Sequence, residues 1–161
     1  MSFSTKLTDL ANRVGARLKE RGETIAVADG SNGGLLSAAL LAVPGASAYY
    51  VGGGTLYTSK SKEIFLGLSH QAATEPRSST EPHTLNLARV IRERLGTTWG
   101  LAETGATGPN GNRYGDAAGH ACLAYAGPSE KSQTIETARA DRVANMDAFA
   151  CAALTLLLEA L

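Results

Sequence analysis

Short apolar runs alternate with segments of helical periodicity along the sequence, and this alternation limits the possible folds more than any other feature. Apolar residues repeat at helical spacing within 5–21, and Gly22 can end that helix in the left-handed conformation. The expected strands are 24–28, 49–58, 99–104, 120–126 and 132–139. The other expected helices are a small-residue helix ending at Pro44, 60–66, one ending at Gly96 and one capped by Asp141.

Strands that alternate with helices predict an α/β fold, here a three-layer α/β/α sandwich around a mostly parallel or mixed sheet of about five strands. The 161 residues, of which 43% are hydrophobic, suit a single domain over 1–161 with one core. Ligands of such sheets usually bind beyond the carboxyl ends of the strands. We therefore expect the functional site at that edge.

Ser78 and Glu81 stand three residues apart just before a helix-periodic segment that ends at Gly96. This is the spacing of a capping box, in which a serine hydroxyl binds a backbone N–H of the first turn. The pattern predicts that Ser78 caps this helix.

The charge balance argues against two classes of partner. Lys and Arg together number 15 and Asp and Glu also number 15, so the sequence has neither a basic stripe for nucleic acid nor a polybasic membrane patch. Cys122 and Cys151 lack C-x-x-C spacing, and the first residues lack the regions of a signal peptide. We expect a reduced, cytoplasmic protein with no nucleic-acid or membrane partner.

We expect no cofactor, and no metal, because His70, His83 and His120 show no metal-ligand spacing.

Glycines and tyrosines gather at 47–57, where small residues permit close approach and tyrosines anchor interfaces. This segment favours a homodimer or a higher homo-oligomer.

The stretch A-D-G-S-N-G-G at 28–34 joins an expected strand to an expected helix. The free N–H groups and the positive dipole end of a helix start suit a phosphate or a developing oxyanion. The stretch matches neither G-x-x-x-x-G-K-[ST] nor G-x-G-x-x-G, so it is not a standard nucleotide motif. Ser31 and Asn32 are also good helix caps, which is the structural alternative to a chemical role.

A second glycine-rich stretch, G-A-T-G-P-N-G-N-R-Y-G at 105–115, follows another expected strand. It can wrap a phosphorylated ligand with Arg113 as a bidentate partner, or it can be an ordinary long surface turn. Glu103 precedes this stretch without an evident role, either as an acid in the pocket or as a partner of Arg113.

Four motifs in order resemble the carboxy-terminal CinA domain family, which includes nicotinamide-nucleotide amidohydrolases. The family reads A-E-S-C-T-G-G, D-x-P-G-S-S-A-Y/W-F, Y-S-N-E-A-K and S/T-G-I-A-G-P-x-G-G. The corresponding stretches lie at 28–34, 43–50, 57–62 and 104–112. The later family element V-G-T-V has no clear counterpart around Gly119. The resemblance implies an α/β/α domain that hydrolyses the carboxamide of nicotinamide mononucleotide to the acid and ammonia, with a Ser nucleophile, a Lys partner and no metal.

The family pattern breaks at the nucleophile. In the first motif the family residues Glu, Ser, Cys, Thr and the two glycines fall on Asp29, Gly30, Ser31, Asn32, Gly33 and Gly34. The expected serine is therefore a glycine here. The family lysine falls on Lys62, with Tyr57 five residues before it, so this half of the dyad is present.

Two accounts follow from this break. In the first, Ser31 supplies the hydroxyl, Lys62 is its general base, and backbone N–H groups near 32–34 hold the oxyanion. In the second, a displacement of about 3.8 Å along the backbone leaves Ser31 away from the ligand and the activity is lost. The leading hypothesis is an amidohydrolase acting on a nicotinamide-mononucleotide-like substrate. The alternatives are a non-catalytic ligand-binding or assembly paralogue, or an amidase or lactamase with another substrate.

The candidate catalytic residues are Ser31, Lys62 and Tyr57, with a solvated helix face as the alternative for Lys62 and packing as the alternative for Tyr57. The candidate substrate-binding residues are Asp29, Gly30, Asn32, Gly33, Gly34, Thr104, Gly105, Gly108, Asn110 and Arg113. The alternative for Asp29, at the end of a strand, is that it only braces the turn.

Overall fold

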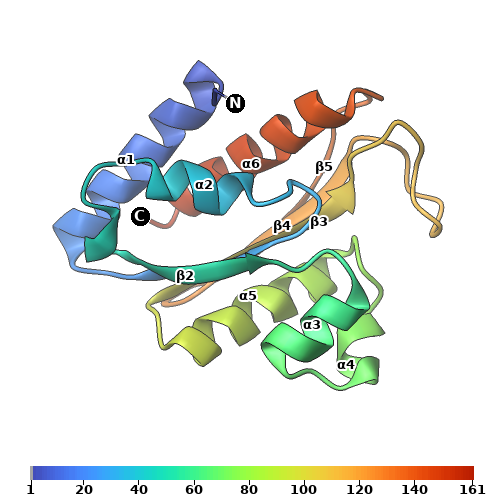
Figure 1. The fold of residues 1–161 in the computed structure, drawn as a ribbon, viewed down its shortest axis with the longest axis horizontal. Coiled ribbons are helices and arrows are strands. Elements are labelled where there is room, and N and C mark those ends of the chain that lie inside the picture. Colours follow the sequence, from blue (N-terminus) through green and yellow to red (C-terminus); the bar gives the residue numbers. More distant parts are fainter. Residues whose placement is uncertain (1) are drawn as a thin grey trace.

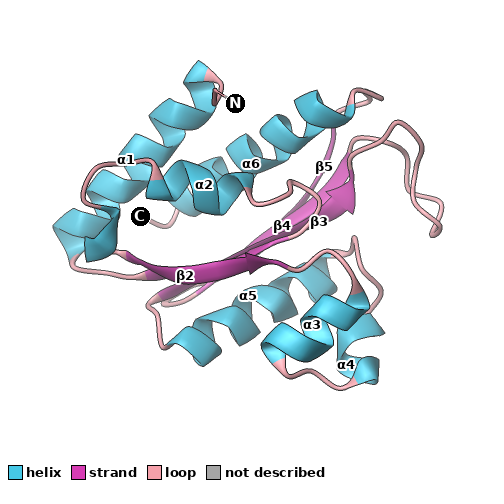
Figure 2. Cartoon of the chain, in the orientation of Figure 1, coloured by secondary structure: helices cyan, strands magenta, loops and turns pink. Residues whose placement is uncertain are grey.

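The computed structural model describes residues 2–161 and places a five-stranded sheet between two layers of helices (Figure 1, Figure 2). The strands are β1 (Ile25–Asp29), β2 (Tyr50–Thr55), β3 (Trp99–Ala106), β4 (His120–Ala126) and β5 (Glu130–Glu136). Their order in the sheet is β2-β1-β3-β4-β5. The strand β1 pairs in parallel with β2 and β3, whereas β4 pairs antiparallel with β3 and β5. The predicted α/β sandwich with a mixed sheet is confirmed.

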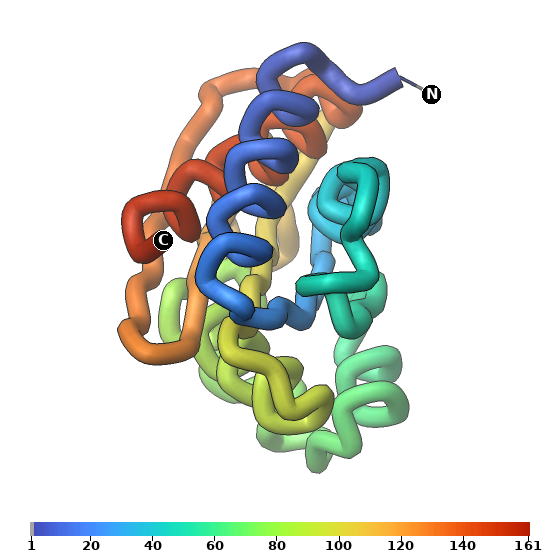
Figure 3. Tube along the Cα trace, turned by 90° about the vertical axis from the view of Figure 1, so that its left-hand side faces the viewer, coloured from blue at the N-terminus to red at the C-terminus, as the bar shows by residue number. Residues whose placement is uncertain are grey.

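Three helices cover each face of the sheet (Figure 1). One layer holds α1 (Thr5–Arg21), α2 (Leu35–Leu41) and α6 (Arg142–Leu158), and the other holds α3 (Ser59–Leu66), α4 (His70–Thr74) and α5 (Glu81–Leu95). A short 3-10 turn, Ala46–Ala48, leads into β2. The first and last helices lie side by side, as Figure 3 also shows. Within residues 2–161, no helix is both long and apolar enough to cross a membrane.

The sheet separates two hydrophobic clusters of unequal size. The larger cluster lies under α1, α2 and α6, and the smaller one packs α5 against the alanine-rich opposite face of β1, β3 and β4. Every residue of β1 and β4 is buried, which agrees with their continuous apolar sequence. The rigid central strands therefore end in well-defined positions, and the loops that follow β1 and β3 start from a fixed edge.

The helix predicted at 5–21 and the strand predicted at 120–126 match the structure, whereas other boundaries differ. The strand predicted at 49–58 is shorter, since α3 already starts at Ser59 and the chain turns after Thr55. The strand predicted at 132–139 begins earlier, at Glu130, and ends at Glu136. The short helix α4 was not predicted, because its five residues carry too little periodicity.

The predicted capping box at Ser78 is wrong. The helix α5 has Thr80 as its N-cap residue, without a side-chain hydrogen bond. In a capping box the Glu81 carboxylate would turn back toward the cap. Here it accepts hydrogen bonds from the hydroxyls of Ser132 and Thr134 on β5, each at 2.8 Å. The Ser78 hydroxyl does not cap the helix, and its Oγ atom instead lies 3.4 Å from Nε2 of His83 on α5.

Candidate functional site

A small cleft of about 50 Å³ opens at the carboxyl ends of β1 and β3, where the sequence predicted the site. Its lining residues are Gly30, Ser31, Leu56, Tyr57, Lys62, Ser78, Ser79, Thr104 and Gly105. A wider cleft of about 550 Å³ adjoins it, and the two share Tyr57, Ser78, Ser79 and Gly105. Another hollow, of about 600 Å³ beside β2, is lined mostly by glycines and apolar side chains. We locate the candidate site in the first pair of clefts, because they hold the hydroxyl and amine groups.

The first glycine loop is held by a buried carboxylate from β3. The Ser31 hydroxyl donates to Glu103 Oε1, and the backbone N–H and side-chain amide of Asn32 donate to Glu103 Oε2 at 2.9 and 2.8 Å. Glu103 is fully buried, and burial raises the pKa of its carboxyl to about 7 against the opposing effect of these hydrogen bonds. The role of Glu103, which the sequence left open, is to anchor this loop.

The same loop also caps α2 through its own side chains. Asn32 Oδ1 accepts the N–H groups of Gly34 and Leu35, both at 3.0 Å. Asp29 accepts the N–H of Leu36 at 3.2 Å and the Ser37 hydroxyl, and burial raises the pKa of its carboxyl to about 6. Asp29 and Asn32 therefore brace the loop from within instead of facing the cleft.

The predicted oxyanion site at 32–34 is wrong for this conformation. The N–H of Asn32 binds Glu103, that of Gly33 binds the carbonyl of Gly30 at 3.2 Å, and that of Gly34 binds Asn32. All three donors already have internal acceptors, so none of them is free to bind an oxyanion.

Gly30 falls where the motif that 28–34 resembles has serine, and a side chain does not fit there without movement. A Cβ atom at Gly30 would lie 2.2 Å from the carbonyl oxygen of Glu103 and 3.3 Å from the Cα of Thr104. The loop approaches the backbone of β3 so closely that only glycine is accommodated without movement. Close packing of Gly30 against the Glu103 carbonyl thus fills the space that a side chain would need.

Lys62 comes from α3 and is almost completely buried, with 2% of its surface exposed. Its Nζ atom lies 2.8 Å from Ser78 Oγ and 2.9 Å from His83 Nε2. Burial lowers the pKa of this amine to about 8. The structure therefore places an amine with a lowered pKa next to a serine hydroxyl. That serine is Ser78 and not Ser31.

His83 accepts a hydrogen bond from Lys62 because its other nitrogen is already a donor. Its Nδ1 atom lies 2.8 Å from the carbonyl oxygen of Pro76, which can only accept, so the ring proton is on Nδ1. The lone pair of Nε2 then faces the lysine. Burial, and next the charge of Lys62, lower the pKa of His83 to about 4, which keeps the imidazole neutral near pH 7.

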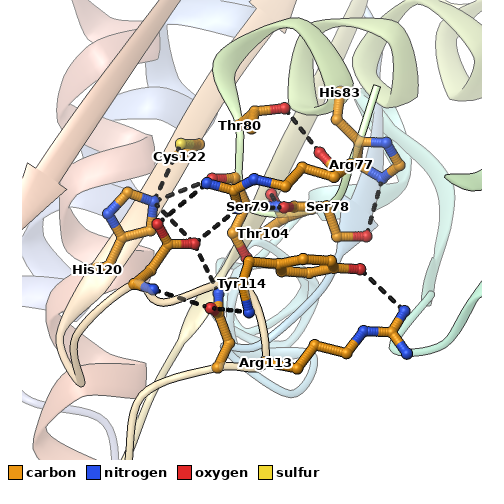
Figure 4. A network of polar contacts seen from close by, with 12 residues as sticks. Arg77, Ser78, Ser79, Thr80, His83, Thr104, Arg113, Tyr114, His120 and Cys122 are labelled. Carbon is orange, nitrogen blue, oxygen red and sulfur yellow. Dashed lines mark hydrogen bonds and ion pairs between the residues drawn. The ribbon is translucent and has the colours of Figure 1, made fainter. Parts of the chain in front are cut away.

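The segment 77–80, which carries Ser78, is fastened to the second glycine loop and to β3 (Figure 4). The Arg77 guanidinium donates to both oxygens of Asp116, at 2.8 and 3.1 Å. The Ser79 N–H donates to Thr104 Oγ1 at 3.2 Å, and the Ser79 carbonyl accepts from His120 Nε2 at 3.0 Å. These contacts fix the backbone on both sides of the serine hydroxyl.

His120 is charged more readily than a free imidazole. Burial opposes its protonation, but the hydrogen bonds to Glu136 and to the Ser79 carbonyl, with the charge of Asp116, raise its pKa. An imidazolium in this position donates through both nitrogens. It therefore ties β4 to the segment that holds Ser78.

The remaining predicted residues are divided between the two clefts and their surroundings. Tyr57 lines both clefts, and its hydroxyl receives a long hydrogen bond of 3.4 Å from Arg142. Arg113 lines the wider cleft and donates to the Tyr114 hydroxyl at 3.0 Å, and it does not meet Glu103. Gly108 and Asn110 lie outside the lining of both clefts.

Sequence reasoning missed Ser78 and His83 as members of the site. Ser78 matched a capping pattern, and His83 was judged only for metal-ligand spacing. A lysine, a serine and a histidine at 62, 78 and 83 have no recognisable spacing, since α4 and the turn after it separate them. No local signal could have found this group.

Comparison with known proteins agrees with the fold and the motifs. A family model described as the CinA C-terminal domain matches residues 7–161. A CinA-like protein of Salinibacter ruber is 36% identical over 141 residues, covering 88% of this chain and 34% of that protein. A CinA-like protein of Gloeobacter violaceus is 39% identical over 121 residues, covering 75% of this chain and 28% of that protein. The chain thus spans about a third of the length of these curated relatives.

Solved structures share the whole architecture. The competence/damage-inducible protein CihA of Agrobacterium tumefaciens superposes with a TM-score of 0.90 at 25% identity, over 99% of this chain and 98% of that chain. A CinA superfamily protein of Escherichia coli gives a TM-score of 0.90 at 23% identity, over 100% of this chain and 94% of that chain. The second likeness concerns the fold alone.

Proposed function

The chain belongs to the CinA C-terminal domain family, and from this premise we propose that it hydrolyses the carboxamide of a nicotinamide-mononucleotide-like substrate to the acid and ammonia. The observation that carries the proposal is Lys62. Its buried amine has a pKa of about 8, lines the cleft and lies within hydrogen-bond distance of a serine hydroxyl. A lysine on a solvated helix face, which was the structural alternative, would not be 2% exposed.

The pKa of Lys62 suits a general base near neutral pH. With a pKa of about 8, roughly a tenth of the amine is unprotonated at pH 7. Such a base takes the proton of a hydroxyl as its oxygen attacks the carboxamide carbon, and it then returns the proton to the departing ammonia. General acid and base catalysis of this kind contributes about 10²- to 10⁴-fold.

The two connected clefts suit the two parts of such a substrate. The inner cleft of about 50 Å³ has room for a carboxamide group beside Lys62. The outer cleft of about 550 Å³ has room for a ribose phosphate, and it is lined by Arg113 and Asn112. A guanidinium is a suitable bidentate partner for a phosphate.

The proposal is tested by measuring ammonia release from nicotinamide mononucleotide with the wild-type chain and with Lys62→Met, which preserves the length of the buried side chain. We expect turnover by the wild type and loss of turnover in the variant. Absence of turnover by the wild type over a range of pH 6 to about 9, a window chosen around the pKa of Lys62, would overturn the proposal.

A second candidate function is that of a ligand-binding paralogue without catalysis. Two contacts favour it, because Gly30 leaves no space for the family serine and the Ser31 hydroxyl is held by Glu103. This candidate predicts binding of nicotinamide mononucleotide without release of ammonia, which calorimetry and the same assay distinguish. Ammonia release from another primary amide, or ring opening of a lactam detected by mass spectrometry, would support the third alternative.

A further inference from the structure

We propose that Ser78 is the nucleophile of this site, with Lys62 as its base and His83 as a positioning residue. The proposal rests on the proposed function for the class of substrate, a carboxamide, but it assigns the reacting hydroxyl independently. It is derived from the arrangement of three side chains that come from α3, the turn before α5, and α5 itself.

The contacts of the two candidate hydroxyls differ. The Ser31 hydroxyl donates its only proton to Glu103, a carboxylate that is fully buried and lies outside the lining of the cleft. A proton passed to Glu103 has no direct path back to a leaving group in the cleft. Ser78 Oγ instead contacts Lys62 Nζ at 2.8 Å, and both residues line the cleft.

The accessibility of the two hydroxyls also favours Ser78. Ser31 is 6% exposed and lines only the inner cleft, whereas Ser78 is half-buried and lies where the inner and outer clefts meet. A substrate that places its phosphate in the outer cleft and its carboxamide in the inner one must pass Ser78. The nucleophile is then at the junction where the amide carbon would lie.

His83 orients the lysine for this reaction. Since the ring proton of His83 is held by the Pro76 carbonyl, its Nε2 lone pair accepts one N–H of Lys62. In the unprotonated lysine, this bond uses one of the two amine protons and leaves the lone pair free to face Ser78 Oγ. The histidine thus acts through Lys62 and not on the substrate.

The backbone next to Ser78 is strained and held from several sides. Ser79 has a φ of 61°, a left-handed conformation that costs a residue with a Cβ atom about 1–2 kcal/mol. The contacts of Ser79 with Thr104 and His120 hold it in this conformation. Strain of this kind persists where surrounding contacts over-determine the backbone, and it is typical of active sites.

A hydroxyl network behind Ser79 completes the support. The Thr84 hydroxyl donates to the Thr80 carbonyl at 2.8 Å, so the 2.7 Å contact between Thr84 and Thr104 is a donation from Thr104. Thr104 Oγ1 is then left to accept the Ser79 N–H. These bonds fix the turn without using the Ser78 hydroxyl, whose own contacts are Lys62 Nζ at 2.8 Å and His83 Nε2 at 3.4 Å.

The proposed reaction conserves atoms and protons. Ser78 Oγ forms a bond to the carboxamide carbon while its proton passes to the unprotonated Lys62 Nζ. The C–N bond then breaks as Lys62 gives that proton to the nitrogen, which leaves as ammonia. Water attacks the resulting ester with Lys62 again as base, the C–Oγ bond breaks, and the proton returns to Ser78 Oγ.

A fluorophosphonate probe tests the nucleophile without reference to the natural substrate. In this reaction the serine oxygen forms a bond to phosphorus, fluoride leaves, and the hydroxyl proton passes to the base. We expect mass spectrometry of the labelled wild type to locate the adduct on Ser78. Labelling is expected to disappear in Ser78→Ala and to fall at least about 100-fold in Lys62→Met. Thermal unfolding confirms that each variant is folded.

The matched comparison is Ser31→Ala, which removes the other serine hydroxyl of the inner cleft. We expect mass spectrometry to locate the adduct of this variant on Ser78, as in the wild type. An adduct on Ser31, labelling that persists in Ser78→Ala, or an unlabelled wild type would each overturn the proposal.

The positioning role of His83 has its own readout. His83→Phe preserves the ring but removes the acceptor for Lys62, and it should slow labelling and shift the pH at which labelling is half-maximal. His83→Gln, whose amide oxygen can accept the same bond, should restore both values toward the wild type. An unchanged rate and an unchanged pH dependence in His83→Phe would show that the histidine has no such role.

Failure of the nucleophile assignment and failure of the proposed function give different results. Labelling of Ser78 without ammonia release from nicotinamide mononucleotide would preserve Ser78 and reject the proposed substrate. Ammonia release that persists in Ser78→Ala would preserve the proposed function and reject Ser78.

Discussion

The Ser31 hydroxyl donates to the carboxylate of Glu103, a residue 72 positions later in the chain. Glu103 also accepts two hydrogen bonds from Asn32. Together these contacts fix the loop at 28–34, which resembles a catalytic motif, as a structural element. Lys62 does not contact this loop serine and has Ser78 and His83 as its partners instead.

Replacement of Lys62 should reduce catalysis strongly without unfolding the protein. Lys62→Met removes the only amine in the lining of the inner cleft, within the part of the chain that the structure describes, and keeps an apolar stem of similar length. We expect ammonia release to fall about 10²- to 10⁴-fold. Lys60→Met, on an exposed position of the same helix, is the control and should retain full activity. Equal activities of the two variants would contradict the role of Lys62.

The pH dependence of turnover should follow the ionisation of Lys62. The unprotonated amine is the active form, so the rate should rise with pH and level off above the pKa of about 8. Initial rates measured between pH 6 and about 10 test this, with the fold monitored by circular dichroism. A rate that falls over this range would mean that the essential group acts in its protonated form.

Glu103→Gln should make the protein less sensitive to alkaline pH. The pKa of Glu103 is raised from 4.5 to about 7 in the folded state, so the unfolded chain loses its proton first as pH rises. The stabilisation is complete below pH 4.5 and is lost as pH rises through about 7, which amounts to about 3 kcal/mol. The introduced amide can donate to Ser31 and accept from Asn32, which preserves the loop.

The measurement for this prediction is denaturant unfolding of both proteins between pH 4.5 and about 8, a window set by the shifted pKa of Glu103. We expect the difference in unfolding free energy to grow in favour of the variant by up to about 3 kcal/mol. A constant difference across this range would mean that Glu103 ionises normally in the folded protein.

Gly30→Ala should destabilise the protein, although the motif that 28–34 resembles has serine at this position. The added Cβ atom would lie 2.2 Å from the Glu103 carbonyl oxygen, and overpacking against backbone costs about 1–3 kcal/mol. Gly54→Ala is the matched control, because its nearest neighbour would be Leu56 Cδ2 at an ordinary 3.7 Å. The measurement is the melting temperature of each variant. Equal melting temperatures would indicate that the loop at 28–34 moves to accommodate the added methyl group.

Arg113→Gln should weaken substrate binding with little effect on the chemical step. Arg113 lines the outer cleft, where the proposed function puts the substrate phosphate, and it lies away from Lys62. Loss of a bidentate charge-assisted contact should raise KM about tenfold while kcat stays within about twofold. Arg13→Gln, on the exposed surface of α1, should change neither value. A fall in kcat alone would place Arg113 at the chemistry instead.

The sequence predicted the fold well because the fold depends on local and periodic signals. Helix α1 was predicted from the spacing of its apolar residues, and β4 from a continuous apolar run. Both elements bury apolar side chains, and the hydrophobic effect requires only that these side chains leave water. The pattern of apolar residues is therefore enough to predict such elements. The short helix α4 and the ends of β2 lacked such signals, and their positions follow from packing and turns.

The sequence by itself determined the α/β architecture, the family and the edge of the sheet at which the clefts form, because periodicity and motif order are written along the chain. Which serine meets Lys62 was decided only by the tertiary structure. Hydrogen bonds act over about 3 Å and depend on direction, so the choice of Ser78 over Ser31 depends on where Glu103 and His83 fall in space. Residues 16 and 72 positions apart were brought to that distance by packing of strands and helices, which no local pattern encodes.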